Sequence, residues 1–174
     1  MRNIIKLLLI PIVSIYILFG SVCQAQDTSE IMKRIPKLME FDSYVTMLPV
    51  PKGMPKIVFN TQEQLDKRYF GKNYNPDIKN WIKAETKGGV IFLNEDFNLK
   101  DEEYVLVHEL VHYMQFENDK YHDYAGEEHQ TPVCKSLMEP EAYRAQDAWV
   151  SATGKGKLSD PFTVMAIVAA CSIE

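Results

Sequence analysis

The pentapeptide His108-Glu109-Leu110-Val111-His112, an HExxH motif, constrains this chain more than any other feature. It lies in a stretch without glycine or proline, from Asn98 to Asn118, in which apolar residues recur at helical spacing. Residues four apart lie on one face of a helix, one turn apart. The two imidazoles can therefore bind one metal ion, with Glu109 placed to act on a water molecule there. The alternative is a core helix with two histidines, which would be costly to bury without partners.

A catalytic zinc ion usually takes three protein ligands and keeps a fourth position for water. The third ligand of a metzincin would require Gly at position 115 and His at position 118, but the chain has Gln115 and Asn118. The downstream histidines, His122 and His129, lie in a polar segment without a fixed spacing rule. The better source of a third ligand is the next predicted helix, which carries two glutamates.

These glutamates form part of a second motif, Glu139-Pro140-Glu141-Ala142-Tyr143. Here the chain, from Val90 to about Gln146, resembles the gluzincin branch of the zincin metallopeptidases. Those enzymes combine HExxH with a later helix that, in several small or membrane-linked branches, reads Glu-x-x-Ala-(Asp/Asn), and the first glutamate binds zinc. The resemblance implies that Glu139 is the third ligand. The chain departs at Tyr143, where the family has a partner for a ligand histidine, and Glu141 remains an alternative ligand.

The resemblance also implies a fold and a reaction. The expected fold is α+β, a minimal zincin-like domain in which a small antiparallel or mixed sheet packs on the HExxH helix and further helices follow. The segment from Gly89 to Asn94 is the expected edge strand along the cleft, where a peptide or protein substrate would pair. Zn²⁺ would activate a water molecule, and Glu109 would act as general base. Candidate donors to the oxyanion are His129, Tyr124, Tyr121, Tyr143 and Arg144.

Two other functions remain open from the sequence. One is a catalytically inactive zincin-fold binding protein that keeps its zinc site, which a chain of this small size would suit. Glu109 speaks against it, because a purely structural zinc ion needs no general base. The other is a metal-dependent hydrolase that acts on an amide outside peptides. The sequence offers no recognition element for either kind of substrate.

The first 25 residues have the order of a secretory signal peptide. Arg2 and Lys6 precede an apolar run from Leu7 to Phe19, and small or polar residues follow as far as Ala25. We expect cleavage after Ala25, export to the periplasm or the medium, and no stable membrane association afterwards. Lipid attachment at Cys23 is the alternative, and a retained anchor is the third option, although the run is short for a full span.

Cleavage would leave residues 26–174 as a single domain with a more acidic charge. The net charge of −5 would become −7, because two basic residues and no acidic residue are removed. An acidic chain without a basic cluster is a poor binder of nucleic acid. Two cysteines would remain, and in an oxidising compartment Cys134 and Cys171 are expected to form a disulfide worth roughly 3–4 kcal/mol. The alternative is that one of them is a zinc ligand or a nucleophile.

Periodicity and turn residues predict the remaining elements. In order, these are a helix over 27–40, weakened by its proline, a strand over 56–60, a helix over 61–70, two strands over 81–86 and 90–94 joined by Lys87-Gly88-Gly89, a polar segment over 117–131 that is either a lid or a mobile loop, a helix over about 133–151, and a last apolar helix over 162–171.

Overall fold

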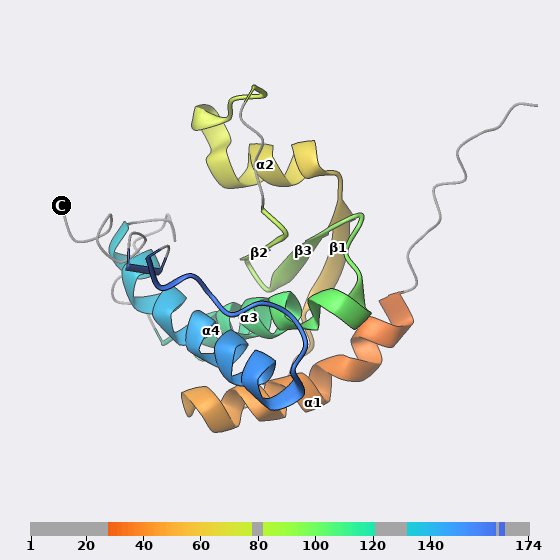
Figure 1. The fold of residues 1–174 in the computed structure, drawn as a ribbon, viewed down its shortest axis with the longest axis vertical. Helices are drawn as coiled ribbons and strands as arrows, with labels where there is room; N and C mark the ends of the chain where they lie inside the picture. Colours follow the sequence, from red (N-terminus) through yellow and green to blue (C-terminus); the bar gives the residue numbers. More distant parts are fainter. Residues whose placement is uncertain (1–27, 78–81, 121–131, 163, 166–174) are drawn as a thin grey trace, which may run out of the picture.

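The computed structural model describes residues 28–77, 82–120, 132–162 and 164–165. It has an α+β architecture, as expected, with helices on both sides of a small mixed sheet (Figure 1). The elements in chain order are α1 (Thr28–Thr46), β1 (Lys56–Asn60), α2 (Gln62–Phe70), the 3₁₀ turn η1 (Gly71–Asn73), β2 (Ala84–Lys87), β3 (Val90–Asn94), α3 (Leu99–Glu117) and α4 (Pro132–Thr153). The signal peptide and most of the predicted 162–171 helix lie outside the described residues.

The sheet has the order β1-β3-β2, so the strand that follows the hairpin turn is central. β1 pairs with β3 in parallel, and β2 pairs with β3 in antiparallel. Gly88 and Gly89 form the predicted turn, both with positive φ (57° and 75°), a conformation that two-residue hairpin turns favour and glycine adopts without strain. The expectation that Gly89 to Asn94 forms an edge strand is therefore wrong: β2 is the edge strand that contacts α3.

The reason for this difference is a long-range pairing. Ile91 and Leu93 on β3 are fully buried. β1 pairs with the edge of β3 that faces away from β2, and Ile57 of β1 lies opposite Ile91. β1 precedes β3 by about thirty residues, so the hairpin sequence itself carries no signal for which of its strands becomes central.

The HExxH helix α3 is the centre of the core. It packs against α1, α4 and the sheet, while α2 contacts all three strands from the other side (Figure 1). Leu106, Val107, Leu110, Val111 and Met114 of α3 are fully buried. A helix that is apolar on most sides is expected in this central position.

Helix α1 keeps its predicted apolar face but is longer than predicted. Ile31, Ile35, Leu38 and Met39 are buried, and Pro36 lies inside the helix without ending it. The helix continues to Thr46, and Phe41 in the added part meets Trp149 of α4 edge to face, with ring centroids 4.9 Å apart. This tertiary contact helps to explain an extension that the local sequence did not predict.

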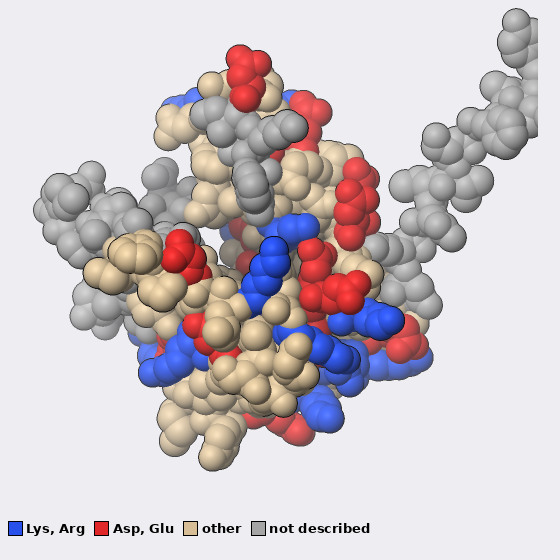
Figure 2. Space-filling model, in the orientation of Figure 1, with Lys and Arg blue, Asp and Glu red and all other residues tan. Residues whose placement is uncertain are grey.

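Helix α2 begins as predicted from its capping residues. Thr61 accepts a hydrogen bond from the backbone N–H of Gln64, and the Gln64 side chain accepts one from the Thr61 backbone N–H, which makes a capping box. Gly71 follows at a φ of 52°. None of the described helices is long and apolar enough to cross a membrane. On the face shown in Figure 2, acidic and basic side chains lie interspersed.

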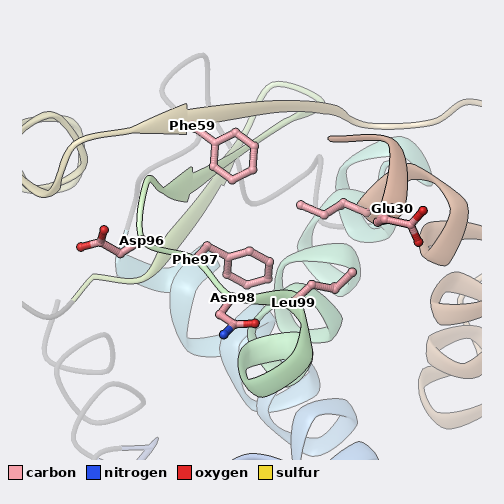
Figure 3. A pocket seen from close by; sticks show the side chains of 7 residues that line it. Glu30, Phe59, Asp96, Phe97, Asn98 and Leu99 are labelled. Atoms are coloured by element: carbon pink, nitrogen blue, oxygen red, sulfur yellow. The ribbon is translucent and has the colours of Figure 1, made fainter. Parts of the chain in front are cut away.

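A small pocket lies at the N-terminal end of α3 (Figure 3). Its volume is roughly 390 Å³, and Phe59, Phe97 and Leu99 are among the residues that line it, with Glu30 and Asp96 at its rim. Leu99 precedes His108 by nine residues, about 13 Å along a helix. No residue of the HExxH motif lines this pocket, so it is separate from the site described next.

Candidate metal centre

Helices α3 and α4 bring three potential metal ligands together. His108 and His112 project from one face of α3, and their Nε2 atoms are 3.1 Å apart. Glu139 reaches them from α4, with Oε2 at 3.4 Å from His108 Nε2 and Oε1 at 3.6 Å from His112 Nε2. Tetrahedral zinc with bonds of about 2.0–2.2 Å places its ligand atoms roughly 3.3–3.5 Å apart. The two Glu139 contacts use different oxygens, and one ligand atom from each of the three residues lies within 4.8 Å of the other two, so the three side chains could hold one metal ion.

The three ligand side chains are largely removed from solvent, with exposures of 11% for His108, 12% for His112 and 18% for Glu139. Burial alone would lower the pKa of His112, but the Glu139 carboxylate reverses this and raises it to about 9. Burial would raise the pKa of Glu139, but the two histidines hold it well below its usual range. The cluster therefore places a carboxylate anion beside two imidazoles. Such a site favours a positive charge, which either a proton or a metal ion can supply.

Gln115 supports His112 from behind the metal position. Its Oε1 lies 2.9 Å from His112 Nδ1, and its Nε2 donates to the Met138 carbonyl at 3.1 Å and to Glu141 Oε2 at 2.9 Å. Gln115 is 1% exposed, so these three contacts fix an amide that has no access to water.

Glu141, the alternative ligand, points away from the histidines. Both of its carboxylate oxygens accept hydrogen bonds from Lys120 Nζ, at 2.7 and 2.9 Å, and one also accepts from Gln115. Among the described residues, only Glu139 of the two glutamates joins the histidine pair. The two-residue difference places Glu141 on another part of the α4 surface, because consecutive residues turn by 100° around a helix.

His108 lacks the support that His112 has. Its Nδ1 is buried and has no hydrogen-bond partner among the described residues. The ring of Tyr143 packs edge-on against it instead, with centroids 4.6 Å apart. Tyr143 occupies the position where the gluzincin motif that the sequence resembles has Asp or Asn, so the departure noted in the sequence coincides with the missing hydrogen bond.

Glu109 is held between the helix and the sheet. It is 6% exposed, and its Oε2 lies 2.7 Å from the hydroxyl of Thr86 on β2, which also lies 3.0 Å from the Glu109 backbone carbonyl. The hydroxyl can donate to the carboxylate and leave the second oxygen, Oε1, for another proton donor. Edge strand β2 thus positions the carboxylate that neighbours the ligand pair.

Of the candidate oxyanion donors, the structure places Tyr143 at the site and Arg144 outside it. Burial and the nearby charges of Glu139 and Glu109 raise the Tyr143 pKa to about 12, so its phenol stays protonated. The Arg144 side chain is 60% exposed and lies 3.6 Å from Glu141. His129, Tyr124 and Tyr121 lie outside the described residues, as do Cys171 and the side chain of Cys134.

No role was predicted from the sequence for Thr86, Gln115 or Lys120. Gln115 stands one turn after His112, a spacing that could have suggested a contact, but it was informative only as a replacement for the metzincin glycine. Thr86 and Lys120 carry no local signal, because their partners lie 23 and 21 residues away.

No family model, curated protein or solved structure matches this chain.

Proposed function

We propose that this protein is an exported zinc-dependent hydrolase that cleaves peptide bonds. The observation that carries the proposal is the convergence of His108 Nε2 and His112 Nε2, 3.1 Å apart, with the Glu139 carboxylate, whose Oε2 lies 3.4 Å from His108 Nε2 and whose Oε1 lies 3.6 Å from His112 Nε2. Distances of this size are similar to those between the ligand atoms of a tetrahedral zinc ion. Two imidazoles with one carboxylate are a donor set of catalytic zinc, and three protein ligands leave the fourth position open. A zinc ion held there would polarise a water molecule and the substrate carbonyl.

The chain supplies the proton transfers. Glu109 follows a ligand histidine directly, and Thr86 holds one of its carboxylate oxygens. The other oxygen would accept the proton of the attacking water and pass it to the leaving amine. Tyr143, protonated because its pKa is near 12, is the donor best placed to stabilise the oxyanion.

A peptide is the proposed substrate because an edge strand adjoins the site. β2 pairs with β3 on one side, and among the described strands nothing pairs with its other side. Such an edge presents backbone N–H and C=O groups to which an extended peptide can add. Thr86 on this strand contacts Glu109, so a peptide aligned along β2 would pass beside the general base. Export follows from the predicted signal peptide and is part of the proposal.

The test uses purified residues 26–174, the chain left after removal of the predicted signal peptide. Zinc content and the hydrolysis of a peptide library are measured on the same preparations. We expect about one zinc ion per chain in the wild type and in Glu109→Gln, because the amide is isosteric and Glu109 is not a ligand. Hydrolysis by Glu109→Gln should fall by about 10²–10⁴-fold, because an amide cannot accept the proton. His112→Ala, the control for the metal site, should lose zinc.

Two results would contradict the mechanism. Full activity in a zinc-loaded Glu109→Gln protein would remove Glu109 as the base. A wild type that holds zinc but cleaves no member of the library would favour a zinc-containing binding protein without turnover, or a hydrolase of amides outside peptides.

A further inference from the structure

A chain of polar contacts runs from Lys120 at the surface through two buried side chains to the candidate ligand His112. Lys120 binds the Glu141 carboxylate, Glu141 accepts from Gln115, and Gln115 meets Nδ1 of His112. Glu141 is 7% exposed and Gln115 is 1% exposed, so the contact between them is shielded from water, whereas the Lys120 side chain reaches Glu141 from the surface and is 36% exposed. Hydrogen bonds in the low-dielectric interior are stronger than exposed ones, so they orient the groups that they join more firmly.

The contacts fix which end of the Gln115 amide faces the histidine. Its nitrogen lies beside two acceptors, the Met138 carbonyl and the Glu141 carboxylate. If the amide were turned over, its oxygen would face both acceptors and two hydrogen bonds would become repulsive contacts. The Gln115 oxygen must therefore face His112, and an oxygen without hydrogens can only accept from Nδ1.

An imidazole that carries its proton on Nδ1 presents the lone pair of Nε2, the atom that faces Glu139 and His108. We propose that Gln115 is the positioning residue of the metal centre: it fixes the tautomer and ring orientation of His112, and Glu141, held by Lys120, fixes Gln115. Glu141 then serves the site without binding the metal. This inference rests on the proposed metal site.

The arrangement also explains an asymmetry between the two histidines. His108 Nδ1 has no described hydrogen-bond partner and is held by contact with the Tyr143 ring, whereas His112 Nδ1 has an acceptor that is itself oriented by two others. Outer partners of a ligand histidine typically contribute 10- to 100-fold to metal affinity. That contribution should come through His112.

The experiment compares Gln115→Met with a matched control, Gln146→Met. Both replace a buried glutamine by a side chain of similar length, but Gln146 makes no described hydrogen bond to the three ligands. Zinc affinity, measured by chelator competition on the full cleaved chain, should fall 10- to 100-fold in Gln115→Met and stay within about twofold in Gln146→Met. Glu141→Ala should have a smaller effect than Gln115→Met, because the Met138 carbonyl still orients the amide.

A second measurement on the wild type keeps the inference testable if Gln115→Met fails to fold. In zinc-loaded protein, long-range ¹⁵N NMR spectra of the four histidines should show His112 protonated at Nδ1 and metal-bound at Nε2. Unchanged zinc affinity in Gln115→Met, or His112 bound through Nδ1, would overturn the role of Gln115 while leaving the zinc site intact. A wild type that binds no more zinc than His112→Ala would instead overturn the proposed function, and this inference with it.

Discussion

At the scale of single residues, the site is defined by which groups have partners. Glu109 and Glu141 accept hydrogen bonds from side chains of other elements, and His112 donates one to Gln115 of the next turn, while His108 contacts an aromatic ring. The side chains that contact the candidate ligands and Glu109 come from β2, from the C-terminal end of α3 and from the middle of α4. This division makes the roles of individual side chains separable by substitution.

Alanine substitutions of the two glutamates in the second motif should differ clearly in their effect on zinc binding. Glu139→Ala removes a ligand and should weaken zinc binding much more than Glu141→Ala, because only Glu139 lies within 3.6 Å of both histidines. Chelator competition on the two purified variants measures the difference. If Glu141→Ala loses the metal and Glu139→Ala keeps it, the second motif is aligned two residues away from its true position.

Tyr143 should contribute to turnover more than to metal binding. Tyr143→Phe keeps the ring that packs on His108 but removes the hydroxyl, which the raised pKa keeps protonated as a donor. We expect kcat to fall by about 10²–10³-fold, the usual effect of losing one oxyanion donor, with zinc content unchanged. Steady-state kinetics on a peptide that the wild type cleaves would show this, and an unchanged kcat would assign the tyrosine to packing alone.

At the scale of elements, the site is a junction of three segments. α3 carries two of the candidate ligands and the proposed general base Glu109, α4 carries the third candidate ligand, and Thr86 of β2 contacts the Glu109 carboxylate. The sheet has a catalytic meaning in this arrangement, because its edge strand determines where the Glu109 carboxylate points.

The contact between β2 and α3 can be tested at Thr86. Thr86→Val preserves shape but removes the hydroxyl that binds Glu109, and hydrogen bonds to charged groups are worth about 1.5–3 kcal/mol. If that loss appears in the transition state, kcat/KM should fall about 10- to 100-fold with zinc retained. Thr86→Ser keeps the hydroxyl and is the matched control. Equal losses in both variants would point to packing of the strand rather than to the hydrogen bond.

At the scale of the whole molecule, one buried carboxyl group should lower the stability of the folded state at neutral pH. Asp42 of α1 is fully buried, and neither carboxylate oxygen has a hydrogen-bond partner among the described residues. Burial raises its pKa well above the usual value. A carboxyl with a raised pKa in the folded state favours folding while it is protonated, and this stability is lost as the pH rises through the folded pKa.

Asp42→Asn should therefore be more stable than the wild type at neutral pH. We expect a gain in the free energy of unfolding of about 1–2 kcal/mol near pH 7, since a buried neutral amide costs less than a buried carboxylate. The gain should disappear near pH 4, the unfolded pKa of aspartate. Urea unfolding of both proteins across this range measures it. A difference that stays constant with pH would show that Asp42 does not titrate in this way.

What could be predicted from the sequence follows the range of the interactions. The histidine pair, Glu109 beside it and the capping box of α2 depend on residues within one or two turns. The hairpin depends on two adjacent glycines. The position of β3 in the sheet depends on β1, and the roles of Thr86, Gln115 and Lys120 depend on how α3 docks against β2 and α4, so no local pattern contained them. The disulfide between Cys134 and Cys171 and the signal peptide stay predictions.

The ligands lie on two helices that are separated in the chain by residues 118–131. An ion bound by His112 and Glu139 would tie these helices together and act as a noncovalent cross-link between two halves of the molecule. Binding to the folded state alone stabilises it, by about 2.7 kcal/mol when the free metal concentration is a hundred times Kd. An ion that supported the proposed hydrolysis would then also affect how long the protein survives in the presence of proteases. Where zinc is scarce, a molecule without the ion would lack this activity and would also be degraded sooner.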